Sequence, residues 1–356
     1  MLALSGYPLG LDFLFLDRSA ATPAGRFAPV LTGEFTDPAL LRQLAERSEV
    51  ISFDWENISV EALRAAVRGT RARIAPPLRA LAAAQDRLHE KRTFERLGIP
   101  TTRFWPVNSH AGLDRAISRI GLPGVLKTRR LGYDGKGQFV LRNLKDRDSA
   151  WELIGNVPLI YEEFVPFEYE VSIIGVRGRR GEIRIYPLNR NYHADGILRL
   201  TLAPWHAPEL LRAATRSLRR VLEAFSYVGV LAIEFFVRRG RLVANEMAPR
   251  VHNSGHWTLE GACTSQFENH VRAIAGLPLG DTRALGHAAM INLIGKMPSR
   301  KSLLAESGLH LHHYGKEPRH GRKLGHCTLV ESSARRRDLR SARILQRLYP
   351  QLPLQP

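Results

Sequence analysis

Hydrophobic and polar positions form alternating blocks along the start of the chain. Short apolar runs at 11–16 and 50–53 predict buried strands. Stretches with helical periodicity at 38–47 and 59–68 predict helices. Asp37 and Ser59 stand directly before the periodic stretches, where N-cap residues belong. Alternation of strand with helix predicts a parallel, doubly wound sheet. The opening residues 1–5 are helical in pattern, however, whereas a doubly wound domain normally opens with a strand and a phosphate-binding turn.

Farther along, apolar runs separated by glycine, proline and polar turns predict helices and then a series of strands. A long helix is predicted at 78–97, after a hinge at 74–77, and a second helix at 208–225. Strands are predicted at 125–127, 139–141, 159–165, 170–177, 183–188, 228–237, 241–246, 289–293, 309–314 and 323–330. Those between 159 and 188 are expected to share one antiparallel sheet. The last residues, 351–356, are expected to form a loose tail.

Composition narrows the class of protein. The 356 residues predict two or three domains at roughly 100–200 residues each, and 44% hydrophobic with 24% charged residues is typical of a globular protein. No apolar run approaches the ~20 residues that span a bilayer, and Asp12 interrupts the apolar start, which disfavours a signal peptide. Cys263 and Cys327 are the only cysteines in the sequence, so we expect a reducing, cytoplasmic location and no membrane.

The net charge of +18 leaves two interpretations open. A nucleic-acid-binding protein uses such an excess against the phosphate backbone. The basic residues are spread along the chain, however, apart from 335–337, and they lack clustered aromatic residues for base stacking. An arginine-rich solvated surface with basic pockets for small phosphorylated molecules explains the charge equally well, and we expect no nucleic-acid partner.

Two acidic residues on neighbouring predicted strands form the strongest chemical pattern. Glu234 lies within an apolar run, and Glu246 ends the next one, directly after Asn245. A carboxylate in an apolar strand is costly unless it is paired or bound to a cation. Magnesium prefers a few carboxylates together with phosphate oxygens, and these side chains supply that set; manganese is an alternative. The competing interpretation is an ordinary salt bridge from each acid to an arginine.

A lysine followed by a glycine-rich loop forms the second pattern. Lys127 ends a predicted strand, and residues 132–138 then supply three glycines that let backbone N–H groups approach phosphate oxygens. Lys127 could neutralise the α and β phosphates, although the same loop also fits an ordinary hairpin turn. A strand edge at 161–165 could read adenine, and Glu170 could accept the ribose hydroxyls; alternatively this is a generic strand.

Two polar clusters follow the proposed metal strands. Arg250, His252 and Asn253 lie close together in the sequence and form a set that can hold a small anion. The histidines here raise zinc as an alternative, but a third soft ligand at suitable spacing is missing. The basic segment 314–323 lies between two predicted strands, and its cations can hold a phosphate monoester. The alternative for this segment is a solvated basic turn.

These segments occur in the order found in ATP-grasp enzymes, and within that superfamily the chain resembles the N5-carboxyaminoimidazole ribonucleotide synthetases. The resemblance covers nearly the whole chain, to about residue 350, and the string that starts at Asn245 is the most specific part. The strings that carry it are Gly132-Tyr-Asp-Gly-Lys-Gly-Gln, Asn191-Tyr-His-Ala-Asp-Gly-Ile-Leu-Arg, Asn245-Glu-Met-Ala-Pro-Arg-Val-His-Asn-Ser-Gly-His-Trp-Thr and Gly321-Arg-Lys-Leu-Gly-His.

The resemblance implies an α/β (α+β) ATP-grasp fold. Its parts would be a biotin-carboxylase-like, doubly wound domain at 1–75, an ATP-grasp region at 91–276 with a lid at about 101–168 and a central mixed sheet, and a β-rich subdomain at 287–350. It also implies an ATP- and bicarbonate-dependent ligase of purine biosynthesis that carboxylates 5-aminoimidazole ribonucleotide through carboxyphosphate and releases ADP and phosphate. A homodimer is implied as well.

The resemblance further assigns roles to individual residues. Magnesium would be held by Glu234 and Glu246. Bicarbonate or carboxyphosphate would be held by Arg250, His252 and Asn253. The residues that would contact ATP are Arg87, Lys127, Gly132, Tyr133, Asp134, Gly135, Lys136, Gly137, Gln138, Glu162, Glu163, Phe164, Val165, Glu170, His193, Asn245 and Glu246. The residues that would contact the ribonucleotide are Tyr133, Asp134, Lys136, Lys316, Arg322 and Lys323.

The start of the chain departs from the family pattern. Family members begin with a strand and a glycine-rich loop before the helix that here begins at Met1. Two explanations are open, a true start upstream of Met1 or a shortened chain. A shortened chain is expected to bind the ribonucleotide more weakly and to keep its ATP site. Two other functions also compete: an ATP-grasp carboxylate–amine ligase with a different acceptor, and a basic nucleic-acid-binding protein with an inactive nucleotide site.

Overall fold

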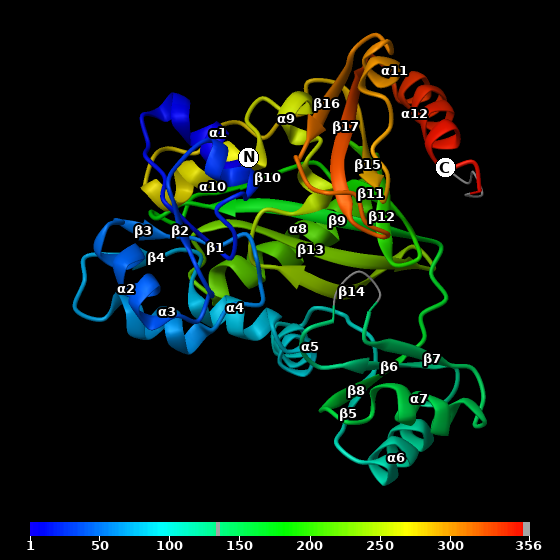
Figure 1. Ribbon diagram of the computed structural model, residues 1–356. Helices are drawn as coiled ribbons and strands as arrows, with labels where there is room; N and C mark the ends of the chain where they lie inside the picture. Colours follow the sequence, from blue (N-terminus) through cyan, green and yellow to red (C-terminus); the bar gives the residue numbers. More distant parts are fainter. Residues whose placement is uncertain (133–135, 352–356) are drawn as a thin grey trace.

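The N-terminal region of the computed structural model, which describes residues 1–132 and 136–351, joins short parallel strand pairs with helices (Figure 1). Strand β1 pairs with β2, and β3 pairs with β4, both in parallel. Asp37 and Ser59 cap the two helices that follow these strands, as predicted. The elements are α1 (Leu2–Gly6), η1 (Tyr7–Leu9), β1 (Phe15–Asp17), η2 (Pro23–Arg26), β2 (Val30–Thr32), α2 (Pro38–Glu46), β3 (Val50–Ile51), α3 (Val60–Val67) and β4 (Arg73–Ile74).

The prediction of one continuous helix at 78–97 is wrong, because this stretch forms two helices, α4 (Leu78–Ala84) and α5 (Arg87–Arg96). Asp86 lies at the break, where its carboxylate accepts hydrogen bonds from the backbone N–H groups of Leu88 and His89. Such a capping contact satisfies donors that a continuous helix would use internally. The break therefore starts a new helix, and Arg87 is its first residue.

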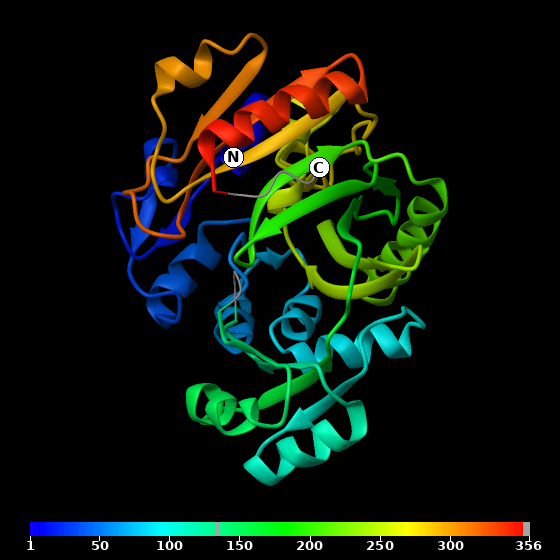
Figure 2. The ribbon, with the colours of Figure 1, turned by 90° about the vertical axis from the view of Figure 1, so that its right-hand side faces the viewer.

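The lid is a separate small sheet with two helices on it, and it projects from the body of the molecule (Figure 1; Figure 2 shows it from the side). Its strands follow the order β5-β8-β6-β7. This contradicts the expectation that 159–165 shares a sheet with 170–177, since β8 belongs to the lid and β9 to the central sheet. The lid elements are β5 (Phe104–Val107), α6 (His110–Ile120), β6 (Gly124–Thr128), β7 (Gln138–Leu141), α7 (Asp146–Ile154) and β8 (Leu159–Glu163).

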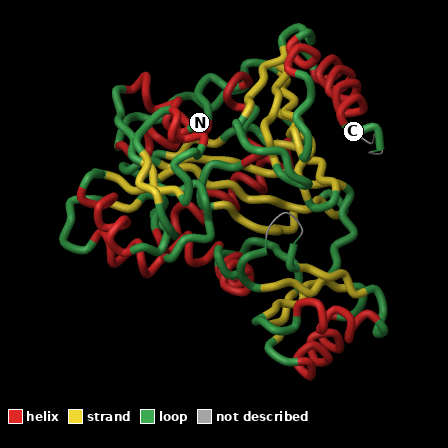
Figure 3. The backbone as a smooth tube through the Cα atoms, in the orientation of Figure 1, coloured by secondary structure: helices red, strands yellow, loops and turns green. Residues whose placement is uncertain are grey.

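The central sheet runs through the middle of the molecule (Figure 3). Its strands follow the order β14-β13-β9-β11-β12-β15-β17-β16, and β10 pairs with β9. These strands pair antiparallel, and a bridge between Thr101 and Ala244 adds a parallel contact at the β14 edge. The strands are β9 (Tyr169–Arg177), β10 (Ile183–Ile185), β11 (Asn189–Ala194), β12 (Ile197–Ala203), β13 (Gly229–Arg238), β14 (Arg241–Ala248), β15 (His287–Ile294), β16 (Leu309–His313) and β17 (Lys323–Glu331).

Helices cover both faces of the central sheet. Ile173 and Ile233 point to one face and pack with Leu218 of α8 (Pro208–Ala224), whereas Ala232 points to the other and packs with Phe267 of α10 (Gln266–Ala275). Because side chains alternate along a strand, burial on both faces produces nearly continuous apolar strands. The remaining elements are η3 (Asn253–Gly255), α9 (Thr258–Gly261), α11 (Arg300–Leu304) and the unpredicted α12 (Ala334–Leu348). No helix of the described residues is long and apolar enough to cross a membrane.

Candidate active site

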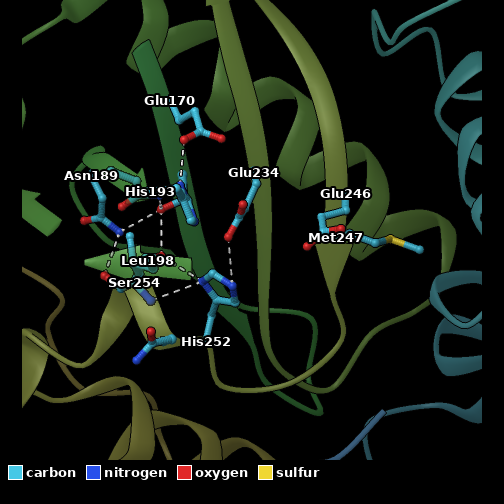
Figure 4. Close-up of polar contacts among 12 residues, drawn as sticks. Glu170, Asn189, His193, Leu198, Glu234, Glu246, Met247, His252 and Ser254 are labelled. Atoms are coloured by element: carbon cyan, nitrogen blue, oxygen red, sulfur yellow. Dashed lines mark hydrogen bonds and ion pairs between the residues drawn. The ribbon is translucent and has the colours of Figure 1, made fainter. Parts of the chain in front are cut away.

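The two acids proposed as metal ligands face each other across a strand pair. Glu234 of β13 is the register partner of Glu246 of β14, and a bulge follows Glu234. Glu234 lies 3.0 Å from Nε2 of His252 (Figure 4). Glu246 lies 3.2 Å from Nη1 of Arg87. Two carboxylates therefore meet at one point of the sheet. Glu246 has the arginine partner that the salt-bridge interpretation requires, whereas Glu234 pairs with a histidine.

The electrostatics of this point favour an ionised Glu234. Burial alone would raise the pKa of Glu234, but the hydrogen bond and charge of His252 outweigh it, with help from His193 and Lys323, and lower the pKa to about 2. Among the described residues, no group of three or more His, Cys, Asp and Glu side chains is placed to hold a metal ion. A pair of acids together with phosphate oxygens of a ligand is a set of donors that fits magnesium.

Helix α5 supports the metal strand with charged residues that the sequence interpretation missed. Oε1 of Glu90 accepts a hydrogen bond of 2.7 Å from the N–H of Met247, and Nζ of Lys91 donates one of 2.9 Å to the carbonyl of Asn245. Burial, and then repulsion by Glu246, raises the pKa of Glu90 to about 8. Glu90 and Lys91 lie three and four residues after Arg87, which the resemblance had already indicated, and this helical spacing is the signal that could have revealed them.

The lid presents Lys127 beside a buried carboxylate. Nζ of Lys127 lies 3.1 Å from Oε2 of Glu162, and Oγ1 of Thr102 donates to the same oxygen at 3.1 Å. Burial would raise the pKa of Glu162, but Lys127, Lys91 and Arg87 outweigh it and hold that pKa far below its usual range. The other oxygen, Oε1, is buried and has no hydrogen-bond partner within the described ranges. It is therefore available to accept a hydrogen bond from a ligand.

The glycine-rich loop is described in part. Tyr133, Asp134 and Gly135 lie outside the described residues. Gly137 has a φ of +70°, and a Cβ there would lie 2.6 Å from Oγ1 of Thr128, so this position requires glycine. Gly132 lies close to Arg87, since a Cβ added at Gly132 would be 3.4 Å from the Nη2 atom of Arg87. The loop thus begins beside the arginine that contacts Glu246. Lys136 is exposed, and Gln138 begins strand β7.

The proposed adenine segment directs its side chains to different partners. The carboxylate of Glu163 pairs outward with Arg103 and Arg238, at 2.9 and 3.0 Å. The N–H of Phe164 donates to the carbonyl of Pro123, and Val165 is buried. The N–H of Glu163 also donates to the carbonyl of Arg103, so both its carboxylate and its N–H have partners within the protein, whereas Glu162 offers a side-chain acceptor.

The proposed ribose-binding acid forms a close pair with a histidine. Nδ1 of His193 lies 2.6 Å from the carboxylate of Glu170 (Figure 4). Burial would lower the pKa of His193, but the hydrogen bond to Glu170 and the charges of Glu234 and Glu246 raise it to about 9. His193 is consequently an imidazolium ion at neutral pH, on the side of the sheet that carries the two acids.

The anion-binding cluster is anchored to several parts of the molecule. His252 lies between Glu234 and Ser254, whose Oγ is 2.8 Å from Nδ1 of the imidazole. The Asn253 side chain exchanges hydrogen bonds with Asn292 of β15. Nε of Arg250 lies 3.0 Å from Glu56 of the N-terminal region. Of the three predicted residues, His252 is therefore the one in direct contact with a proposed metal ligand.

The basic segment before β17 concentrates positive charge near the acids. Nζ of Lys316 lies 5.5 Å from the ring centroid of Tyr314. Burial lowers the pKa of Lys316, and the charges of Arg322 and Lys323 lower it further. Lys323 also acts on the pKa of Glu234, so the segment lies close to the metal strands. A lysine whose pKa is lowered by neighbouring cations favours an anionic ligand.

Comparison with known proteins agrees with this geometry. Family models match three stretches, described as ribonucleotide synthetase preATP-grasp domain at 1–85, ATP-grasp domain at 92–267 and phosphoribosylaminoimidazole carboxylase C-terminal domain at 288–339. The fold and the site thus define an ATP-grasp enzyme.

Individual relatives show to which family of ATP-grasp enzymes the chain belongs. The N5-carboxyaminoimidazole ribonucleotide synthase of Pseudomonas aeruginosa is 50% identical over 329 residues, which cover 92% of this chain and 91% of that protein. The crystal structure of the synthetase from Thermus thermophilus matches with a TM-score of 0.94 and 48% identity, over 100% of this chain and 97% of that one. The chain belongs to the N5-carboxyaminoimidazole ribonucleotide synthase family, whose members are ATP-dependent enzymes of purine biosynthesis.

A third structure contains ligands. The synthase from Aspergillus clavatus in complex with ADP and 5-aminoimidazole ribonucleotide matches with a TM-score of 0.91 and 26% identity, over 99% of this chain and 96% of that one. That protein holds both ligands on the same fold.

Proposed function

We propose that this site makes N5-carboxyaminoimidazole ribonucleotide from ATP, bicarbonate and 5-aminoimidazole ribonucleotide, with release of ADP and phosphate. The observation that carries the proposal is the meeting of three features at Glu234. Its register partner is Glu246, its ion-pair partner is His252, and the charge of Lys323 acts on its pKa. An acid pair, an anion-binding cluster and a basic segment therefore share one place.

ATP is proposed to lie between the lid and the central sheet. Oε1 of Glu162 has no hydrogen-bond partner among residues 1–132 and 136–351, and it is suited to accept a hydrogen bond from the exocyclic amine of adenine. Lys127 and Arg87 supply positive charge for the phosphates, and the pair of Glu170 and His193 is assigned to the ribose side. Glu234 and Glu246 present hard oxygen donors that fit magnesium or manganese, which would neutralise charge on the transferred phosphoryl group.

Bicarbonate is proposed to bind beside the metal strands. Bicarbonate is a weak nucleophile, and two anions must meet before it can attack the γ-phosphate. His252, Arg250 and Asn253 would orient it, and orientation is a main source of rate when phosphoryl transfer needs no covalent enzyme intermediate. The carboxyphosphate formed in this way reacts readily with water, so closure of the lid over the site would protect it until the amine attacks.

The ribonucleotide is proposed to place its phosphate at Lys316, Arg322 and Lys323. Arg322 and Lys323 lower the pKa of Lys316, and this supports the assignment, because a bound dianion would offset the repulsion among the three cations. Tyr133, Asp134 and Lys136 are assigned to the same ligand by resemblance.

Phosphate release tests the function. The proposal predicts release that requires bicarbonate and 5-aminoimidazole ribonucleotide together. Replacement of Lys316 or Arg322 with alanine should raise the KM for the ribonucleotide and leave the KM for ATP nearly unchanged. An enzyme that turns over with another acceptor, and that tolerates both replacements, would instead be a different ATP-grasp ligase.

The metal assignment has its own test. Glu246→Gln removes one hard anionic donor and should abolish turnover while the melting temperature stays within a few degrees of the wild type. Calorimetry should show that magnesium no longer strengthens ADP binding in this variant. Glu223→Gln, on the exposed side of α8, is the matched control. Retained magnesium dependence in Glu246→Gln would remove the assignment.

Two further proposals rest on resemblance and composition. A homodimer is the expected assembly, which sedimentation velocity can test, and the cytoplasm is the expected location, which fractionation can test.

A further inference from the structure

A fully buried lysine on α5 has no role in the reaction described above. Lys91 is 0% exposed, yet its ammonium group is surrounded by oxygen atoms. It donates to the carbonyls of Asn245 and Ala244 at 2.9 and 3.3 Å and to Oγ1 of Thr101 at 3.2 Å. It also lies 3.4 Å from Oε2 of Glu162. A buried ammonium group is costly unless it is paired in this way, so the contacts define one preferred position.

The oxygens around Lys91 come from the two halves of the proposed nucleotide site. Ala244 and Asn245 belong to β14 and directly precede Glu246, the proposed metal ligand. Glu162 belongs to β8 of the lid and holds Lys127 through the same oxygen that Lys91 approaches. One ammonium group thus connects the sheet half of the site to the lid half.

Thr101 strengthens this connection at the root of the lid. Its hydroxyl donates to the carbonyl of Ala244 at 2.7 Å, and the N–H of Ala244 donates to the carbonyl of Pro100 at 2.7 Å. The chain enters the lid immediately afterwards. Lys91 therefore lies where the strand bearing Glu246 meets the segment from which the lid extends.

We infer that Lys91 is a positioning residue that fixes Lys127 of the lid relative to Glu246 of the central sheet. The inference rests on the proposed function, in which these two side chains act on one triphosphate. Charge stabilisation of a transferred phosphoryl group depends on donors held in place before reaction. Without the ammonium group, two carbonyls of β14 lose a donor. Among the described residues, Glu162 then keeps Lys127 and Thr102 as partners, and the contact between the sheet half and the lid half at this point is lost.

The test compares Lys91→Met with the wild type and with Arg92→Gln, an exposed neighbour on the same helix. Methionine keeps the unbranched, apolar stem of lysine and removes the charge. We expect Lys91→Met to lower kcat/KM for ATP by roughly 10- to 100-fold, the scale of a small misplacement of reacting groups. The KM for 5-aminoimidazole ribonucleotide should change less than about twofold, and Arg92→Gln should match the wild type.

Calorimetry and a second variant separate positioning from folding. ADP binding with and without magnesium, together with the melting temperature, is measured for each variant. Positioning predicts a smaller magnesium-dependent gain in ADP affinity for Lys91→Met. Thr101→Val is close in shape to the wild type, and it removes a partner of Lys91. It should weaken kcat/KM for ATP in the same direction by about 2- to 10-fold, the range of one hydrogen bond.

Two results would overturn the inference. One is equal weakening for ATP and for the ribonucleotide in step with a lower melting temperature, which is the behaviour of a purely structural residue. The other is unchanged ATP kinetics in both variants. Failure of the proposed function is distinguishable, because the wild type would then show no phosphate release dependent on bicarbonate and ribonucleotide, while the ADP-binding comparison would still report on Lys91.

Discussion

His270 makes stability depend on pH in a way that the structure quantifies. The ring is fully buried on α10, its Nδ1 atom accepts from the N–H of Val230 at 3.1 Å, and its Nε2 atom lies 3.0 Å from Oγ of Ser52. An Nδ1 acceptor requires a neutral ring with its proton on Nε2. Burial lowers the pKa of His270 to about 4, so the folded protein resists protonation there.

The contribution of His270 to the free energy of unfolding follows from the difference between its pKa in the folded and in the unfolded chain. The unfolded chain binds this proton with a pKa of about 6.5, whereas the folded chain binds it at about 4. The neutral ring therefore contributes stability above pH 6.5, and that contribution is lost as the pH falls from 6.5 towards 4. The full difference is about 3 kcal/mol, and about 2 kcal/mol of it is lost at pH 5.

Denaturant unfolding at pH 7.5 and pH 5 measures this contribution. In His270→Asn the amide oxygen can still accept from Val230, but no group titrates. The variant will be less stable at pH 7.5, because it loses ring volume and the contact with Ser52. The wild type should lose about 2 kcal/mol more than the variant between the two pH values. His310→Asn, at an exposed position, should behave as the wild type. An equal loss in His270→Asn and the wild type would refute the reasoning.

Three other predictions concern the site and its supports. His193, with a pKa raised to about 9, should lose its charge and weaken ATP binding as the pH rises through 9, and His193→Gln should show no such step in a plot of KM against pH. Asp86→Ala removes the cap of α5 and the contacts to Arg129 at 3.0 and 2.6 Å, and should cost about 2 kcal/mol in a thermal melt; no loss would contradict the cap assignment. Gly137→Ala forces a left-handed residue against Thr128 and should raise the KM for ATP and for the ribonucleotide in steady-state kinetics, because residues of this loop are assigned to both ligands; unchanged KM values would contradict the loop assignment.

Much of the local structure followed from the sequence. Asp37 and Ser59 cap the helices that their positions predicted. The pairing of Glu234 with Glu246 was also predictable, because a tight turn joins the two strands and an antiparallel hairpin brings such positions together. Spacing along the chain is enough for these features, since the interacting groups are near neighbours in sequence.

Other features were decided by contacts between distant segments. Apolar runs at 159–165 and 170–177 look alike, yet β8 pairs within the lid and β9 pairs with β13. Strand propensity specifies that a segment is extended and does not specify its partner.

The buried charged residues show most clearly that contacts between distant segments cannot be predicted from the local sequence. Lys91 and Glu162 are separated by 71 residues, and each looks like a surface residue in the sequence, because lysine and glutamate are rarely buried. Their burial is tolerable only where the fold supplies compensating charges and backbone carbonyls. The sequence by itself indicated candidate residues for binding phosphates and a divalent cation. Only the tertiary structure determined which buried charges hold those residues in place, because an ion pair of this kind has no local signature.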